Sequence, residues 1–218
     1  MSWSIQQAPG TASARHRKRP PSSIRSLTVT LMHQTEITGL ILCGGAATRM
    51  GGQDKGLVCF HGRPLVDIAI DRLRAQVSQI LISANRNCRE YETRGYQVLK
   101  DPGFQDDGPN YDGPLAGFLA GLNAATTPWI MTVPCDCPRF PTDLVSQLIQ
   151  ASPNPDVVRY VAGHPTFSLV PVVRLKSLMA TLQRGQRKLG DWLSEQQAVS
   201  IPVRDEEAFR NLNSPQDF

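Results

Sequence analysis

The chain has 218 residues, of which 40% are hydrophobic and 19% charged, a composition typical of one folded domain with a tail. No apolar stretch is long enough to span a bilayer, so we do not expect an integral membrane protein. Of the 23 basic residues, five lie in the first 31 positions, which contain no acidic residue. The remainder has 18 basic and 19 acidic residues, and this near-neutral balance gives no reason to expect nucleic-acid binding.

Residues 1–34 are predicted to be a disordered, basic extension, because they are rich in Ser, Pro and Gln and show no hydrophobic periodicity. Met32 stands just before the first predicted strand, so an earlier start codon assigned in error would explain the extension. An organellar transit peptide is the alternative, since Arg and Ser without acids is its usual composition. Residues 35–218 are predicted to form one domain. The five scattered cysteines, without a secretory signal, indicate free thiols and a cytoplasmic, reducing compartment.

Strand-like and helix-like patterns alternate from residue 36 onward. This alternation predicts an α/β fold, a single Rossmann-like, doubly wound, mostly parallel sheet with helices on both faces. Residues 102–113 contain three Asp, three Gly and two Pro and are expected to form an irregular loop over the mouth of the site. The predicted strands cover residues 38–42, 79–84, 96–99, 129–133, 157–161, 166–172 and 199–203, and the predicted helices cover residues 64–76, 114–125, 141–150, 175–183 and 190–196.

The loop after the first predicted strand is rich in glycine and carries two cations. The glycine pairs Gly44-Gly45 and Gly51-Gly52 allow backbone N–H groups to approach an anion, and Arg49 and Lys55 supply positive charge. Such a loop at the carboxyl end of a first strand is where open α/β sheets bind nucleotides. The spacing fits neither a Walker A loop nor the dinucleotide fingerprint. A solvated surface loop is the alternative interpretation.

A second candidate site follows the strand predicted over residues 129–133. Asp136 stands just past that strand, where a carboxylate can hold a Mg²⁺ ion that bridges nucleotide phosphates. A turn or helix-capping role is the alternative. Asp101 is a weaker second acid at the same edge. Cys135 and Cys137 flank Asp136, but their spacing and the lack of nearby partners favour buried thiols over a zinc site.

The chain resembles the molybdenum cofactor guanylyltransferases, the MobA family, over essentially everything after residue 36. The first loop alone would fit many nucleotidyltransferases, whereas the later motifs point to this family. The matching segments are Leu42-Cys43-Gly44-Gly45, Arg49-Met50-Gly51-Gly52, Asp54-Lys55-Gly56-Leu57, Gly113-Pro114-Leu115-Ala116-Gly117, Pro134-Cys135-Asp136, His164-Pro165-Thr166 and Asn211-Leu212-Asn213-Ser214-Pro215.

The resemblance implies that the domain transfers GMP from GTP to the terminal phosphate of molybdopterin and releases pyrophosphate, with Mg²⁺ on Asp136. Arg49 and Lys55 are then the expected catalytic residues, and His164, Asn211 and Asn213 are expected on the molybdopterin side. The family often has Asn-Ala-Asn where this chain has Ser83-Ala84-Asn85, so a nucleotide contact is expected to differ there. The residues expected to contact the nucleotide are Leu42, Cys43, Gly44, Gly45, Gly52, Lys55, Ser83, Asp101 and Asp136.

Two other functions remain open from the sequence. One is a different nucleotidyltransferase, which would use CTP for molybdopterin or a sugar phosphate as acceptor. The other is a non-catalytic nucleotide-binding adaptor that delivers the cofactor to molybdoenzyme apoproteins or delivery proteins. The adaptor is disfavoured because both Asp136 and Lys55 are present.

Overall fold

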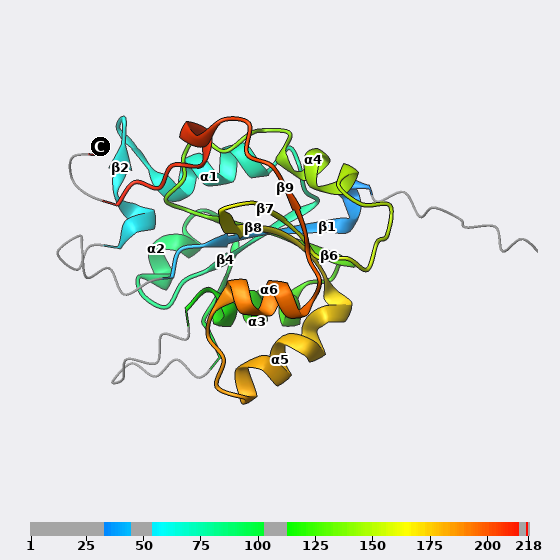
Figure 1. Ribbon diagram of the computed structural model, residues 1–218. Coiled ribbons are helices and arrows are strands. Elements are labelled where there is room, and N and C mark those ends of the chain that lie inside the picture. Colours follow the sequence, from blue (N-terminus) through cyan, green and yellow to red (C-terminus); the bar gives the residue numbers. More distant parts are fainter. Residues whose placement is uncertain (1–32, 45–53, 103–112, 214–216, 218) are drawn as a thin grey trace, which may run out of the picture.

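The computed structural model describes residues 33–44, 54–102, 113–213 and 217. Its centre is a seven-stranded sheet in the order β5-β4-β1-β6-β8-β7-β9 (Figure 1). The β1 strand pairs in parallel with β4 and β6, and β4 pairs in parallel with β5. The strands are β1 (Ile37–Leu42), β4 (Gln79–Ser83), β5 (Gln97–Leu99), β6 (Trp129–Pro134), β7 (Arg159–Val161), β8 (His164–Pro171) and β9 (Val199–Ile201).

The β8 strand is antiparallel to both β6 and β7, while β9 is parallel to β7. Only Ala162 and Gly163 separate β7 from β8, and a parallel connection would need a crossover of a dozen or more residues. Gly163 has a φ of 77°, which a glycine adopts without strain in this tight turn. The prediction of a mostly parallel sheet is therefore confirmed, with one antiparallel strand.

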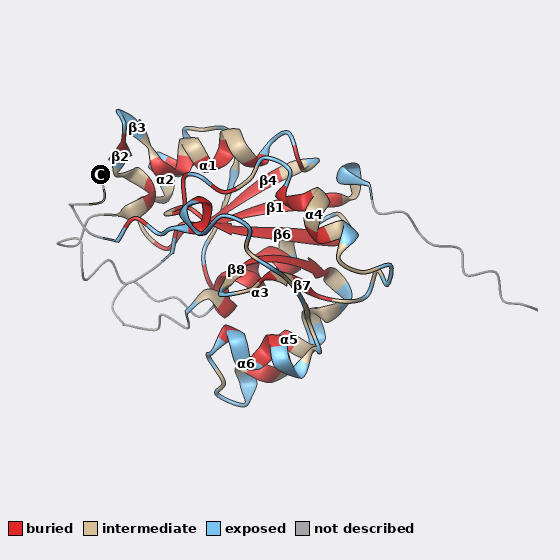
Figure 2. Ribbon diagram, turned by 45° about the horizontal axis from the view of Figure 1, so that its top comes forward, coloured by how far each residue is buried: buried red, intermediate tan, exposed pale blue. Residues whose placement is uncertain are grey.

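Helices cover both faces of the sheet, as the alternating pattern predicts. The α1 and α4 helices lie on one face, and α3, α5 and α6 lie on the other (Figure 1). Figure 2 shows the buried strands enclosed between these layers, with exposed residues on the outer sides of the helices. The helices are α1 (Leu65–Leu73), α2 (Cys88–Glu92), α3 (Pro114–Ala124), α4 (Leu144–Gln150), α5 (Leu175–Gln183) and α6 (Leu189–Glu195).

Several local features differ from the sequence prediction. The α1 helix ends at Leu73 rather than at residue 76, and Pro64 belongs to β3 and precedes the helix. The α4 helix begins at Leu144 rather than at residue 141, because a Pro-Thr-Asp turn precedes it. The short α2 helix was not predicted. Neither was the β2–β3 hairpin (Cys59–Phe60 and Arg63–Pro64), which turns at His61 and Gly62 with φ of 49° and 79°.

The 3₁₀ helices are η1 (Gln34–Glu36), η3 (Lys55–Leu57), η4 (Val172–Arg174) and η5 (Glu206–Phe209).

The α3 helix packs unusually close to the sheet. A Cβ atom on Gly117 would lie 2.9 Å from Leu42 Cδ2 and 3.0 Å from Ser83 Oγ, and one on Gly121 would overlap the Leu40 side chain. The two glycines therefore allow the helix backbone to approach the ends of β1 and β4. This close packing holds the carboxyl ends of the central strands in fixed positions.

The strand order places a topological switch point between β1 and β6. The chain runs from β1 to β4 and β5 on one side, and α3 then carries it back to β6 on the other side of β1. Open α/β sheets bind their ligands in the crevice outside the carboxyl ends of strands at such a point. Among the helices of the described residues, none has the length and apolar character needed to cross a membrane.

Candidate functional site

Lys55 and Asp136 meet at the switch point. Lys55 begins η3 in the segment that follows β1, and its Nζ lies 3.2 Å from Asp136 Oδ2 just past the end of β6. The two side chains are 24% and 15% exposed, so the ion pair is only partly open to solvent. Lys55 Nζ also donates a hydrogen bond of 2.6 Å to Asn213 Oδ1. The structure thus brings together three residues that the sequence analysis singled out separately.

Backbone contacts hold Asp136 in place. The N–H of Cys135 donates to the Leu42 carbonyl at 3.1 Å, which extends the β1–β6 pairing past the end of both strands. On the other side, the N–H of Leu212 donates to the Asp136 carbonyl at 2.9 Å. Asp136 is therefore fixed between the first strand and the carboxyl-terminal segment.

A polar network around Asp54 holds the start of η3, next to Lys55. Asp54 caps η3 by accepting from the Gly56 N–H at 3.3 Å, and it also accepts from Tyr91 Oη at 2.5 Å and from Asn87 Nδ2 at 3.2 Å. Burial above all raises the pKa of the Tyr91 hydroxyl far above its usual range, and the hydrogen bond to Asp54 adds to this effect. Tyr91 is therefore a protonated donor at neutral pH.

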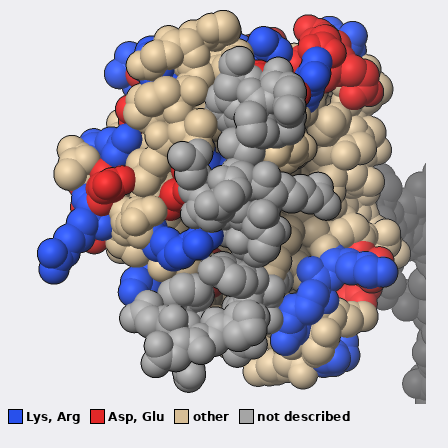
Figure 3. All heavy atoms as spheres, turned by 90° about the vertical axis from the view of Figure 1, so that its left-hand side faces the viewer, with Lys and Arg blue, Asp and Glu red and all other residues tan. Residues whose placement is uncertain are grey.

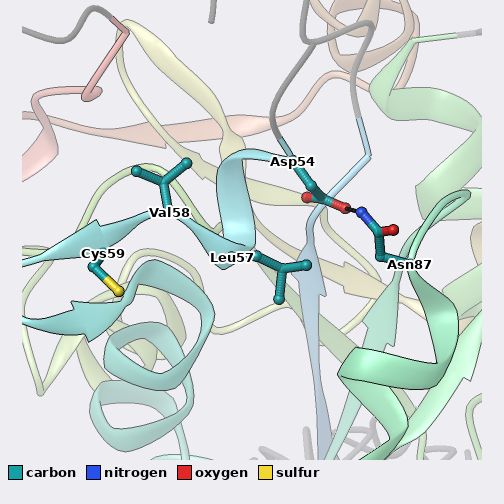
Figure 4. Close-up of a pocket in the computed structure, with 5 residues that line it drawn as sticks. All are labelled: Asp54, Leu57, Val58, Cys59 and Asn87. Carbon is teal, nitrogen blue, oxygen red and sulfur yellow. Dashed lines mark hydrogen bonds between the residues drawn. The ribbon is translucent and has the colours of Figure 1, made fainter. Parts of the chain in front are cut away.

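A shallow pocket of about 370 Å³ lies beside this network (Figure 4). In the close-up, the Asp54 and Asn87 side chains point toward each other, and Leu57, Val58 and Cys59 follow one another along the chain from η3 into β2. Its described lining residues are Asp54, Leu57, Val58, Cys59 and Asn87.

Asp101 belongs to a second, more buried group of side chains at the ends of β4 and β5. Its Oδ1 accepts from Ser83 Oγ at 3.1 Å, and its Oδ2 accepts from Asn85 Nδ2 at 2.8 Å. The Asp101 N–H donates back to Asn85 Oδ1 at 2.9 Å. A Cβ atom on Gly44 would lie 3.9 Å from both Asn85 Nδ2 and Asp101 Oδ2, so the backbone of the first loop passes directly over this group.

Asn85 is named from the sequence only within the segment Ser83-Ala84-Asn85 and is not among the residues expected to contact the nucleotide. It makes two hydrogen bonds to Asp101, through Nδ2 and through Oδ1. The signal was present, since Asn85 is a polar residue two positions past the strand that ends at Ser83. Asp54 was also missed as part of the site, although its place before Lys55 fits a helix-capping residue.

His164 and Asn211 lie at the same edge of the sheet. His164 begins β8 and stacks on Phe209 with a ring separation of 5.3 Å, and its Nε2 lies 3.3 Å from Glu206 Oε2. Asn211 Oδ1 accepts from the Cys137 thiol at 2.7 Å. The predicted molybdopterin contacts at His164, Asn211 and Asn213 thus share one edge, but their role toward that substrate stays a prediction.

The three cysteines near the site are free and buried. Cys43 and Cys135 follow β1 and β6, and Cys137 lies one residue past Asp136. A hydrogen bond with Cys43, together with burial, raises the pKa of the Cys135 thiol, and burial followed by the charge of Asp136 raises that of Cys137. Neutral thiols of this kind pack as small apolar groups. Among the residues the structure describes, no group of three or more His, Cys, Asp or Glu side chains is arranged so that it could hold a metal ion.

The donor set suits a metal ion that arrives with its substrate. Mg²⁺ is usually held by one or two carboxylates together with substrate phosphates and waters. Asp136 offers one such carboxylate at the switch point, where its Oδ2 is paired with Lys55 and its Oδ1 accepts a weak hydrogen bond of 3.8 Å from the Cys137 thiol. The residues present therefore fit a metal whose remaining ligands come from a nucleotide and water.

The rest of the predicted loop falls outside the described residues. Gly45, Arg49 and Gly52 belong to residues 45–53, and most of the predicted loop over residues 102–113 is also outside. Figure 3 looks onto this edge of the molecule, where Lys and Arg side chains lie on both sides of the segments drawn in grey. Only Cys43 and Gly44 of the loop are described, and they follow β1 where its end pairs with β4 on one side and β6 on the other.

A mostly parallel sheet with Lys55 and Asp136 paired at its switch point is the arrangement expected of a nucleotide-binding α/β protein. Residues 39–199 match the family model for the MobA-like NTP transferase domain. The chain is 41% identical over 191 residues to a molybdenum cofactor guanylyltransferase of Polynucleobacter asymbioticus, covering 84% of this chain and 94% of that one. It is 44% identical over 191 residues to the protein of the same name in Serratia proteamaculans, covering 85% and 93%. The chain therefore belongs to the family of MobA-like NTP transferases, and it is a nucleotidyltransferase.

Solved structures share the fold. The molybdopterin-guanine dinucleotide biosynthesis protein A of Archaeoglobus fulgidus superposes with a TM-score of 0.66 at 18% identity, over 83% of this chain and 94% of that one. The 2-C-methyl-D-erythritol 4-phosphate cytidylyltransferase of Thermus thermophilus gives 0.62 at 14% identity, over 84% and 95%. At these identities the likeness concerns the fold alone, and it confirms the predicted Rossmann-like class.

Proposed function

We propose that this chain transfers GMP from GTP to the terminal phosphate of molybdopterin and releases pyrophosphate. The observation that carries the proposal is the meeting of Lys55 and Asp136 at the switch point of a MobA-like sheet. The names of the relatives at 41% and 44% identity support the same activity.

The reaction needs charge neutralisation and positioning more than proton transfer. A phosphate oxygen of molybdopterin attacks the α-phosphorus of GTP, the bond to the β-phosphate oxygen breaks, and pyrophosphate leaves with the electron pair. The attacking oxygen is already anionic, so no general base is required. Lys55 and Arg49 would neutralise the triphosphate and the charge that develops on the leaving group. Mg²⁺, held by Asp136 and the phosphates, would supply further positive charge there.

The buried group around Asp101 would face the guanine nucleotide. Ser83 and Asn85 donate hydrogen bonds to the two carboxylate oxygens of Asp101. The backbone of Gly44 lies next to the Asn85 and Asp101 side chains. Hydrogen-bonding groups of this kind discriminate strongly between bases, because a mismatched base leaves them unpaired. We place the backbone of Leu42, Cys43 and Gly44 on the nucleotide, and His164 and Asn211 on the molybdopterin side.

The test is a transfer assay with purified protein, molybdopterin, Mg²⁺ and each of GTP, CTP and ATP. We expect pyrophosphate release and the dinucleotide product with GTP, and much less with CTP or ATP. A clear preference for CTP would indicate the cytidylyl transfer instead. Binding of GTP without any product would favour the adaptor role in cofactor delivery to molybdoenzyme apoproteins. On this proposal the protein works in the cytoplasm, without nucleic acid or membrane as partner.

A further inference from the structure

Three consecutive residues of the carboxyl-terminal segment 211–213 each make a hydrogen bond to a residue at the site. Asn211 Oδ1 accepts from the Cys137 thiol, the Leu212 N–H donates to the Asp136 carbonyl, and Asn213 Oδ1 accepts from Lys55 Nζ. The segment is anchored by Leu212, which is 2% exposed and packs in an apolar cluster with Phe60 and Leu65. A segment far away in sequence is thereby fixed against the two charged residues of the switch point.

The contact of Asn213 with Lys55 differs in kind from that of Asp136. An amide oxygen accepts a hydrogen bond from the ammonium group without neutralising its charge. A lysine side chain has four flexible carbons, and ordering it on a ligand costs conformational entropy. A neutral acceptor at 2.6 Å fixes the Lys55 ammonium in advance while leaving its full charge for an anion. Asp136 at 3.2 Å, by contrast, competes with any anion for that charge.

We propose that Asn213 is a positioning residue for Lys55, which holds the ammonium group at the switch point so that the triphosphate meets it already ordered. This inference rests on the proposed function, since it concerns how the same site binds GTP. It assigns Asn213 to the nucleotide side of the reaction through Lys55, in place of direct contact with molybdopterin.

The test measures the affinity of the full-length protein for GTP with Mg²⁺ in the absence of molybdopterin. We expect Asn213→Ala to weaken the affinity about 10-fold, the effect of losing one hydrogen bond to a charged group. The matched control is Asn123→Ala, since Asn123 is an exposed residue at the far end of α3 and its variant should bind as the wild type does. In a Lys55→Ala background, Asn213→Ala should cause no further loss, because the residue acts through Lys55.

A direct molybdopterin contact predicts a different result. Asn213→Ala would then raise the KM for molybdopterin and leave the GTP affinity unchanged, and this outcome would overturn the inference. An equal loss of GTP affinity with and without Lys55 would also overturn it. These results overturn the inference alone, because the wild type still binds GTP in each of them. Failure of the wild type itself to bind GTP would instead overturn the proposed function, and the inference with it.

A second variant covers the case in which Asn213→Ala does not fold. Asn213→Asp has nearly the same shape and accepts the same hydrogen bond, so thermal unfolding should stay close to that of the wild type. The added carboxylate would pair with the Lys55 ammonium group and compete with the phosphates for it. We therefore expect the affinity for GTP to fall at least 10-fold at low salt. Unchanged affinity in Asn213→Asp would show that residue 213 does not act on Lys55.

Discussion

Lys55 and Asp136 exchange partners in the proposed reaction. In the free protein each is the counter-ion of the other across 3.2 Å, and both side chains are partly exposed. Ion pairs near the surface contribute roughly 0–1 kcal/mol, so separating this one costs little. A triphosphate with its metal ion offers each residue a partner of higher charge. The pair therefore keeps the site neutral without opposing the substrate strongly.

Replacing Lys55 by Ala should lower kcat on the order of 100-fold, the usual scale for removing a preorganised charge partner of the transition state. The measurement is steady-state pyrophosphate release with GTP and molybdopterin. Lys176→Ala, at an exposed position on α5, is the control and should retain normal turnover. Near-normal turnover of Lys55→Ala would contradict the catalytic role.

Replacing Asp136 by Asn should remove metal-dependent activity and keep the fold. The exchange is nearly isosteric, and the backbone carbonyl still accepts from the Leu212 N–H. Circular dichroism should therefore match the wild type, while activity across a Mg²⁺ titration stays low. Asp191→Asn on the exposed side of α6 serves as control. If Asp136→Asn works at ordinary Mg²⁺, the metal ligand lies elsewhere.

At the scale of elements, the close packing of α3 on the sheet can be tested with a Gly→Ala substitution. Here the effect expected from packing is opposite to the effect expected from helix propensity. Gly→Ala in a helix normally gains up to about 1 kcal/mol, but at Gly121 the new methyl group would overlap Leu40, which is fully buried. Overpacking of a core costs roughly 1–3 kcal/mol, so Gly121→Ala should lower the free energy of unfolding in a urea titration.

Gly190 supplies the matched comparison for this substitution. It lies in α6, is exposed, and has no atom within 4 Å of the position a Cβ would take. Gly190→Ala should therefore leave stability unchanged or raise it by up to about 1 kcal/mol. Equal effects of the two substitutions would mean that α3 does not need its glycines to pack.

For the whole molecule, the distribution of thiols predicts a stepwise reaction with a thiol reagent. Cys59 is exposed and should react fast, and Cys88 is half-buried and should react more slowly. Cys43, Cys135 and Cys137 are buried, and the raised pKa of the last two keeps them protonated well above neutral pH. Absorbance of a released chromophore should show three thiols that react only after unfolding, and Cys59→Ser should remove the fast phase.

A chain that begins at Met32 should fold and act like the full chain. Residues 1–31 lack hydrophobic periodicity in their sequence, so we expect them to contribute no packing to the domain. Melting temperature and kcat/KM for GTP are the measurements. A fall of several degrees in the melting temperature on truncation would show that the extension contributes to the folded domain.

The sequence by itself determined the fold class, and it indicated the strand ends that carry the candidate site residues. Apolar runs and helical periodicity are local signals, so they predicted the seven main strands within a few residues and the helices on both faces. The glycine-rich loop and Asp136 were recognisable because each directly follows a strand, and the carboxyl ends of parallel strands meet at one edge. The α2 helix was missed because five residues are too few to show a period.

Only the tertiary structure decided which side chains meet. Lys55 is 81 positions from Asp136 and 158 from Asn213, and no local pattern encodes a contact over such separations. The resemblance implies a molybdopterin contact for Asn213, which stays a prediction, and the structure adds a hydrogen bond from Lys55 to Asn213 beside Leu212, which packs with Phe60 and Leu65. The reason is physical. A strand or helix forms from neighbours along the chain, but a binding site is set by the burial of apolar anchors that bring distant segments together.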